Sequence, residues 1–425
     1  MYTKHMKKIV ILLLGSVSIL NINAQISINQ EISNLSVKAF SHFPKIKEAE
    51  NTISLAEEKA KLVALNRQPD VTGDAGYSYV RPKIELPING SKFQFAPLNN
   101  VSANVNGTYT LLDFGRLKAA ITQSKNELKM ATHGKELVQH QLAYQTAAIC
   151  FQIVYLQKAI TIQDTLINIL EENRRMAESL FKNGTALEID VLGIASSIDA
   201  EQNRKTELNS MLRKQLILLE YATGENSFKG NSFDINLQAG MNSNSANPEL
   251  LISQDKWEQA KQDLSISQLK NRPVVGLRAS MGTRNGYLPY ISDLRFNYVA
   301  GLNFSVPLYN GGKIKQQVKI QEKLAEQQSL ALETLQQSIS KDIKQINEEL
   351  SSTGERLNRS QSQIEVAKRS VVLAQSRLKN GTGTHLEVSG ANAMLQKALL
   401  NRLQLEFQQC NAKLEYGRLM GWKFW

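Results

Sequence analysis

Four segments of the chain alternate between apolar and polar residues with a period of two. They are residues 71–79, 101–111, 275–281 and 296–306. In the last of them Phe296, Tyr298 and Leu302 alternate with polar residues such as Asn297 and Asn303. Because successive side chains of a strand point to opposite sides, this pattern predicts four strands, each with one apolar and one polar face.

Between the predicted strands the hydrophobic spacing is helical, and two of the helices are predicted to be very long. No proline falls between Pro97 and Pro248, and none follows Pro307. Proline in a helix interior costs about 3 kcal/mol, so these stretches, rich in Leu, Ala, Gln, Glu and Lys, favour uninterrupted helices over 116–182 and 313–379. At 1.5 Å per residue each spans roughly 100 Å, which predicts an elongated fold.

The second long helix carries a seven-residue repeat. In the first, Ile153, Ile160 and Ile167 keep the same period until Arg174 breaks it. A strict seven-residue period predicts supercoiled packing against neighbouring helices. The repeating positions in the second helix are Ile343, Leu350, Leu357, Ile364, Val371 and Leu378.

The chain contains an internal repeat at an offset of 197 residues. Lys182, Asn183, Gly184 and Thr185 recur as Lys379, Asn380, Gly381 and Thr382. Each glycine stands 69 positions beyond a turn glycine, Gly115 or Gly312. Long helices that end at the same glycine cap predict two copies of one structural unit.

These patterns divide the chain into four parts: residues 1–24, 25–222, 223–247 and 248–425. The first repeat is predicted to contain a helix from about residue 44 to 66, a strand hairpin over 70–112, the long helix 116–182, a tip at 183–185 and a return helix over 187–221. The second is predicted to contain a helix from 248, a hairpin over 274–307, the long helix 313–379, a tip at 380–383 and a return helix over 386–418. Residues 82–98 are predicted to form a long loop, and the linker 223–247 a short strand near 233–237.

The first residues resemble a secretory signal peptide. Lys4, Lys7 and Lys8 precede an apolar run from Ile9 to Leu14, and Ala24-Gln25 is a suitable cleavage point. The alternative is a membrane anchor, but Gly15, Ser16 and Ser18 interrupt the run before it reaches spanning length. We therefore expect an exported mature chain without a transmembrane helix.

Composition points away from nucleic acids and from catalysis. Removal of the leader takes away three lysines and no acidic residue, so the formal net charge falls from +11 to +8. The remaining charges are interleaved along helices, without the aromatic and basic patch typical of nucleic-acid binding. Since there is no Walker loop, nucleophile elbow or zinc spacing, we expect neither an enzyme nor a cofactor or metal site.

The cysteines and histidines show no ligand pattern. Cys150 and Cys410 lie in predicted helices, where a disulfide and two buried free thiols are both open alternatives. His133 and His140 share a helical face but are too far apart to bind one metal without a third ligand, so we expect them at the surface or between helices.

Strands of this length and period fit a transmembrane β-barrel or a soluble sandwich, and the leader and long helices favour the barrel. Four strands cannot close a barrel in lipid, because unpaired strand edges are too costly there. The chain is therefore expected to oligomerise. The predicted polar face suggests a water-filled barrel, which favours a trimer of twelve strands over a dimer of eight. The residues of this polar face include Asp74, Asn104, Asn106, Arg278 and Asn303.

The order of elements resembles a known family. A helix, a strand, a loop, a strand, a turn, a long helix, an Asn-Gly-Thr tip and a return helix occur twice, and the turns read Leu112-Asp113-Phe114-Gly115-Arg116 and Leu308-Tyr309-Asn310-Gly311-Gly312-Lys313. This doubled order is similar to that of the TolC-type outer-membrane efflux proteins, over essentially the whole mature chain.

The resemblance implies a homotrimeric channel in the lipid of the outer membrane, with a large periplasmic α-barrel. It also implies a periplasmic membrane-fusion adaptor and an inner-membrane pump of the RND or ABC type as partners, and no nucleic acid. The tips, Lys182 to Thr185 and Lys379 to Thr382, would contact the adaptor. Acidic residues at the position of Glu387, which Asp190 matches in the first repeat, would ring the periplasmic entrance.

Some positions depart from the prototype of the family. Gly390 stands where a second acidic residue is expected, and Leu378 and Gly383 replace a tyrosine and an arginine that help to lock the entrance. The first functional hypothesis is thus a passive exit duct for efflux or type I secretion. The alternative is a periplasmic coiled-coil scaffold or adaptor without a pore, which leaves the four strands unexplained. A duct for metal ions would predict a Met or His lining, which the sequence lacks.

Overall fold

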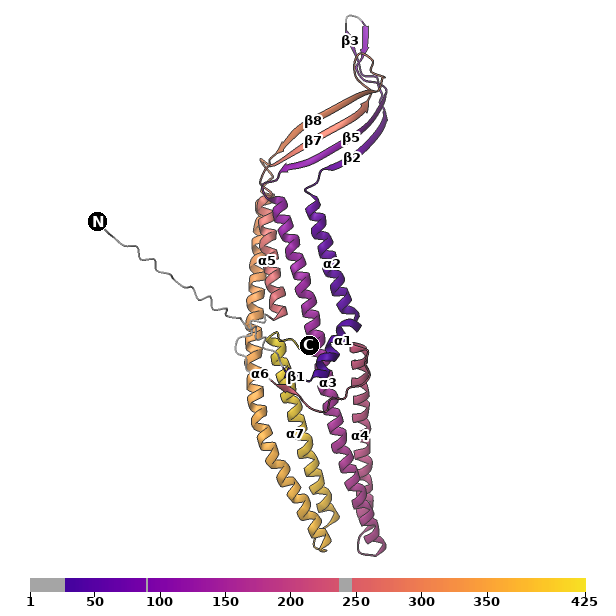
Figure 1. Ribbon diagram of the computed structural model, residues 1–425, viewed down its shortest axis with the longest axis vertical. Coiled ribbons are helices and arrows are strands. Elements are labelled where there is room, and N and C mark those ends of the chain that lie inside the picture. Colours follow the sequence, from indigo (N-terminus) through magenta and orange to yellow (C-terminus); the bar gives the residue numbers. More distant parts are fainter. Residues whose placement is uncertain (1–26, 89–90, 237–246) are drawn as a thin grey trace, which may run out of the picture.

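Two helices of 67 residues, α3 (Arg116–Lys182) and α6 (Lys313–Lys379), organise the molecule. The structure is a computed structural model that describes residues 27–88, 91–236 and 247–425. The predicted leader and residues 237–246 of the predicted linker lie outside the described residues. Figure 1 shows an elongated molecule with a sheet at one end and two helical tips at the other. The predicted fold class, mainly helical with a four-stranded sheet, is confirmed for the single chain.

Shorter helices pack beside α3 and α6 in two tiers (Figure 1). Next to the sheet, neighbouring pairs are α2 with α3, α3 with α5 and α5 with α6. Towards the tips, the pairs are α4 with α3, α3 with α7 and α7 with α6. No helix among the described residues is long and apolar enough to cross a bilayer. The shorter helices are α1 (Gln30–His42), α2 (Pro44–Leu65), α4 (Glu188–Thr223), α5 (Pro248–Leu269) and α7 (His385–Leu419).

The main sheet has the strand order β2-β5-β7-β8, and all of its pairs are antiparallel. The two repeats meet at its centre, where β5 pairs with β7, and each repeat supplies one edge strand. Because direction alternates across these four antiparallel strands, the edge strands β2 and β8 run in opposite directions. The strands are β2 (Asp70–Tyr79), β5 (Asn99–Leu112), β7 (Val274–Arg284) and β8 (Arg295–Ser305).

The prediction of a long loop over residues 82–98 is wrong, because this segment contains a second hairpin. Strand β3 (Glu85–Ile88) pairs with β4 (Ser91–Gln94) and projects beyond the main sheet (Figure 1). The alternation of Ile84, Leu86 and Ile88 before Asn89-Gly90 is a typical hairpin signal, which the prolines in the segment obscured. A proline is tolerated in this two-stranded ribbon because both of its strands are edges.

Helix α6 packs through two heptad rows rather than one. The predicted row from Ile343 to Leu378 is mostly half-buried, whereas Ile364 within it is buried. A second row, offset by four residues towards the N-terminus, is buried throughout. From Thr353 onward the side chains of this row are small or polar, which lets the helices approach closely. Its members are Ile339, Ile346, Thr353, Ser360, Ala367 and Ala374.

The largest apolar core lies at mid-length, where distant parts of the chain meet. Helix α1, which the sequence patterns did not predict, packs there against α3. The short strand β1 (Ser27–Ile28) pairs with β6 (Ile235–Asn236), which lies within the segment predicted to hold a strand. Phe424 and Trp422 of the C-terminal segment are buried in the same core.

The two cysteines are free and buried, so of the two alternatives the structure contains the free thiols. Burial raises the pKa of Cys410 to about 12 and raises that of Cys150 as well. Both histidines on α3 lie between elements. His140 Nε2 donates to the carbonyl oxygen of Trp422 at 2.9 Å, and His133 Nδ1 lies 2.5 Å from Oδ2 of the buried Asp255 on α5.

Candidate functional site

The main sheet has one polar and one apolar face. Register pairs such as Asp74 with Asn104 and Tyr109 with Leu277 place like residues opposite each other across the strands. The polar face carries Thr72, Asp74, Asn104, Asn106, Thr108, Arg278, Ser280, Asn297 and Asn303. The apolar face carries Val71, Tyr77, Val105, Tyr109, Leu277, Met281, Phe296, Tyr298, Leu302 and Phe304.

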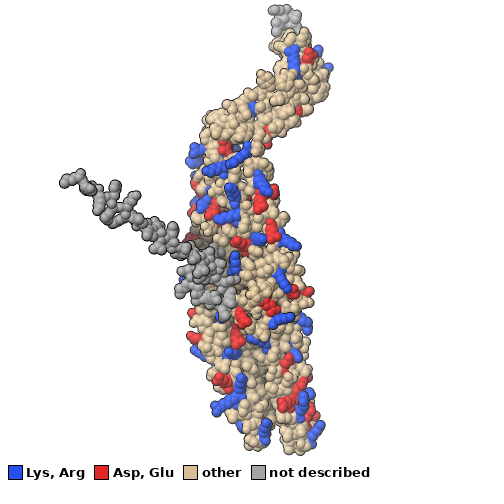
Figure 2. Space-filling model, in the orientation of Figure 1, with Lys and Arg blue, Asp and Glu red and all other residues tan. Residues whose placement is uncertain are grey.

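The apolar face is uncovered in the single chain. Tyr298 is 77% exposed, Leu302 72% and Phe296 69%. Figure 2 shows charged side chains spread along the helical part, whereas the sheet is mostly uncharged on the side in view. A contiguous exposed apolar surface of this kind marks contact with lipid or with protein.

Both edges of the main sheet are unpaired in the single chain. Strand β2 pairs only with β5, and β8 only with β7, among the described residues. An exposed edge presents free backbone N–H and C=O groups to another strand. Since β2 and β8 run in opposite directions, the β8 edge of one copy can pair antiparallel with the β2 edge of another.

The polar face is organised by hydrogen bonds and by one close backbone approach. Asn106 Nδ2 donates to Oδ2 of Asp74 across β5 and β2. A Cβ on Gly282 would lie 2.2 Å from the carbonyl oxygen of Ala103 and 2.5 Å from Asn104 Oδ1. Glycine is therefore required where β7 passes β5, since any side chain would clash.

The two tips, at the opposite end of the molecule, have the same cap geometry. Gly184 and Gly381 both have a φ of +72°, a left-handed conformation in which glycine carries no Cβ penalty. Beyond them, the backbone N–H of Thr185 donates to Leu180 O at 2.9 Å, and that of Thr382 to Arg377 O at 2.9 Å. The repeated sequence motif therefore forms a repeated turn.

The two acidic residues after the tips are each engaged within their own tip. Asp190 Oδ2 accepts a hydrogen bond from the backbone N–H of Leu187 at 3.3 Å, at the start of α4. Glu387 Oε2 lies 3.5 Å from Nη1 of Arg377, in the last turn of α6. The structure places Asp190 and Glu387 at equivalent positions of separate tips. Their role at a pore entrance stays a prediction.

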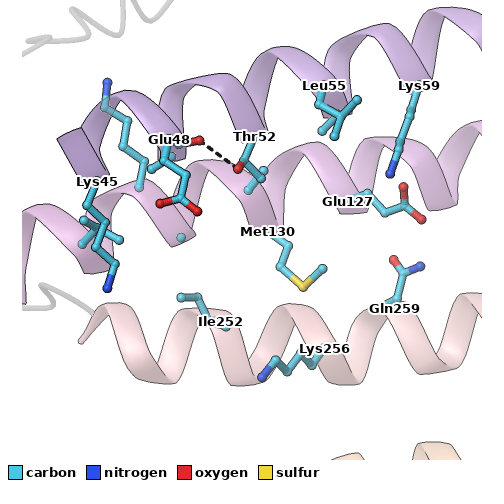
Figure 3. A pocket seen from close by; sticks show the side chains of 16 residues that line it. Lys45, Glu48, Thr52, Leu55, Lys59, Glu127, Met130, Ile252, Lys256 and Gln259 are labelled. Atoms are coloured by element: carbon cyan, nitrogen blue, oxygen red, sulfur yellow. Dashed lines mark hydrogen bonds between the residues drawn. The ribbon is translucent and has the colours of Figure 1, made fainter.

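A groove of about 620 Å³ lies between α2, α3 and α5. In Figure 3, Leu55 and Met130 line its interior, and Lys45, Lys59 and Lys256 extend along it. Its charged lining residues are Lys45, Glu48, Lys59, Glu127, Lys135 and Lys256.

Sequence reasoning missed two features of this framework. Arg377 at the second tip is found only when the two repeats are aligned, because the first repeat has Leu180 at that position. Asp255 is buried between α3 and α5, where Lys129 and His133 pair with it. In the described part of the chain, no three His, Cys, Asp or Glu residues are grouped to bind a metal ion.

The sequence was compared with protein families and with curated proteins. The sequence profile described as "Outer membrane efflux protein" matches residues 35–225 and 242–421. No curated protein matches the sequence.

Several solved structures share the fold. The outer membrane protein VceC of Vibrio cholerae is similar at a TM-score of 0.79 and 17% identity, over 93% of this chain and 97% of that one. The CmeC outer membrane channel of Campylobacter jejuni gives 0.78 and 16%, over 92% and 86%. The MtrE outer membrane channel of Neisseria gonorrhoeae, solved in its open state, gives 0.74 and 14%, over 92% and 89%.

Proposed function

The chain belongs to the outer membrane efflux protein family, and we propose that it forms the exit duct of a tripartite efflux or type I secretion system. Cargo enters from the periplasm and leaves through the outer membrane. The duct is passive, and an inner-membrane pump of the RND or ABC type supplies the driving force. In this proposal the protein is a channel.

The observation that carries this proposal is the two-faced, four-stranded sheet with open edges. One face suits lipid and the other suits water, as in a transmembrane barrel. Unpaired strand edges are too costly in hydrocarbon, so the edges must be filled by other copies. Three copies, joined through β8 and β2, give a closed barrel of twelve antiparallel strands around an aqueous lumen.

The helices extend the same duct. In a homotrimer, α3 and α6 of three chains form a tube roughly 100 Å long, given 67 residues at 1.5 Å per residue. The two heptad rows on α6 support such a wall, because a seven-residue period favours helices that supercoil around one another. A coiled-coil scaffold without a pore would explain the helices but leaves the apolar sheet face without a role.

The tips are the periplasmic end of the proposed duct. Their caps present Lys182, Asn183, Gly184 and Thr185, and Lys379, Asn380, Gly381 and Thr382, for contact with a membrane-fusion adaptor. Three copies of Glu387, together with three copies of Asp190 at the equivalent position of the first tip, would line the entrance. Rings of like charge at a constriction set the sign of the ions that pass.

Conductance tests the proposal. The detergent-purified protein, added to a planar bilayer, is expected to give discrete conductance steps, because a closed twelve-stranded barrel holds water. A heat-denatured sample is the control for detergent artefacts. A protein that remains in solution without detergent and gives no steps would contradict the duct and favour the scaffold.

A further inference from the structure

An ion pair joins α6 to α7 in the second tip, whereas the equivalent positions of the first tip, Leu180 and Asp190, form none. Nη1 of Arg377, near the end of α6, lies 3.5 Å from Oε2 of Glu387, in the first turn of α7. Nη2 of the same guanidinium donates to the carbonyl oxygen of Thr382 at 3.1 Å. The arginine is therefore held across the turn by two groups and is directed at the acidic residue.

Two positions of the second tip differ from their equivalents in the first tip. Where the second tip has Arg377 and Gly383, the first has Leu180 and Ala186. A Cβ on Gly383 would lie 2.9 Å from Cβ of Arg377 and 3.0 Å from the backbone nitrogen of Leu378. The turn therefore passes close to the backbone at the end of α6, next to the arginine.

The two tips also differ in formal charge. Over residues 178–190 the first tip has three acidic residues and one lysine, whereas over 375–387 the second has Arg377 and Lys379 against Glu387 alone. Asp190 has no ion pair within the described chain, and its carboxylate caps α4 instead.

We propose that Arg377 is a specificity-determining residue of the duct, whose guanidinium cancels the charge of Glu387 at the entrance. This inference rests on the proposed function, in which three copies of the second tip surround the entrance. Three bare carboxylates would favour cations strongly. With each paired to an arginine, the ring carries no net charge and admits anionic and cationic cargo alike.

The test is the ratio of K⁺ to Cl⁻ permeability, taken from the reversal potential of the purified protein in a planar bilayer under a KCl gradient. Arg377→Leu, which installs the residue of the first tip, is expected to raise the ratio about fivefold, since a unit charge at ~4 Å in water changes ion occupancy by about that factor. Glu387→Gln is expected to lower it by a similar factor. The double variant is expected to return near the unmodified ratio.

Two further variants serve as controls. Arg377→Lys keeps the charge and is expected to keep the ratio. Arg359→Leu removes an arginine that lies 3.5 Å from Glu355 on the same helix, away from the tip, and is expected to change nothing.

The results of these experiments distinguish failure of the proposed role of Arg377 from failure of the proposed duct. A shift in Glu387→Gln without a shift in Arg377→Leu would overturn the role of Arg377 and leave the entrance in place. Conductance with unchanged selectivity in both variants would overturn the inference and move the entrance away from the tips. Absence of conductance in the unmodified protein would overturn the duct itself.

Discussion

Gly282 occupies a position on the polar face of the sheet where β7 passes closest to β5. The sequence shows only a glycine within a predicted strand, which is compatible with a bulge, a bend or a close approach. The register of β5 and β7 decides between these, because it brings the backbone of Ala103 and Asn104 against Gly282.

Gly282→Ala is expected to destabilise the protein by about 1–3 kcal/mol, the usual cost of forcing extra atoms into a filled site. Gly301→Ala is the matched control, because Gly301 lies on the same face in β8 and a Cβ there meets nothing within 4 Å. Thermal unfolding in detergent, followed by circular dichroism, measures both. Equal unfolding temperatures for the two variants would contradict the close approach.

His140 is a second residue whose position has a measurable consequence. It is 3% exposed, and burial lowers its pKa from 6.5 to about 4, with the positive charge of Arg418 acting in the same direction. The folded protein therefore binds a proton less readily than the unfolded chain. The stabilisation due to neutral His140 is full above pH 6.5 and is lost as the pH falls from 6.5 towards 4.

At 1.36 kcal/mol per pKa unit, this loss amounts to about 3 kcal/mol across the window. His140→Gln, which keeps an N–H donor for Trp422, is expected to flatten the fall in unfolding temperature between pH 6.5 and pH 4. The exposed His42, replaced by glutamine, is the control. Unfolding curves with the same pH dependence in both variants would contradict a buried neutral His140.

Among the helices and strands, the strongest sequence signals were patterns that extend over a whole element. Proline-free stretches and the seven-residue period predicted α3 and α6, and alternation predicted the strands of the main sheet. These signals succeed because each depends on the regular geometry of one element. The elements that sequence reasoning missed, α1 and the β3–β4 hairpin, are short and contain few periods or several prolines.

The second heptad row of α6 shows a different limit of sequence reasoning. Thr353, Ser360 and Ala367 are buried although none is a large apolar residue. Their burial depends on how closely α6 approaches its neighbours, which is a property of the packed helices. Similarly, the pair of Arg377 and Glu387 depends on the turn between α6 and α7, although the aligned repeats reveal the unusual arginine.

In the whole molecule, the single chain leaves apolar surface open on both its helices and its sheet. Apolar cores form along the helices, but Leu192, Ile217 and Val372 on the helices are more than half exposed, and the sheet leaves one apolar face and two edges open. The repeat explains this arrangement, because each copy contributes one hairpin and the two hairpins form only part of a closed wall. Three chains supply the rest in our proposal.

In the proposed barrel the β8 edge of one chain pairs with the β2 edge of the next, and cysteine cross-linking measures this pairing. Ala75→Cys on β2 is combined in turn with a cysteine at Tyr298, Ala300 or Leu302 on β8. The native thiols do not interfere, because burial keeps Cys150 and Cys410 protonated and unreactive. Ala103→Cys on the central strand β5, combined with Ala300→Cys, is the control.

Oxidation of at least one β2–β8 pair in the detergent-extracted protein is expected to give covalent dimers and trimers on a denaturing gel, while the control stays monomeric. Neighbouring antiparallel strands bring facing Cβ atoms to within about 5.5 Å, close enough for a disulfide after small adjustments. Monomers at every β2–β8 pair, together with a monomeric mass in detergent, would contradict the closed barrel.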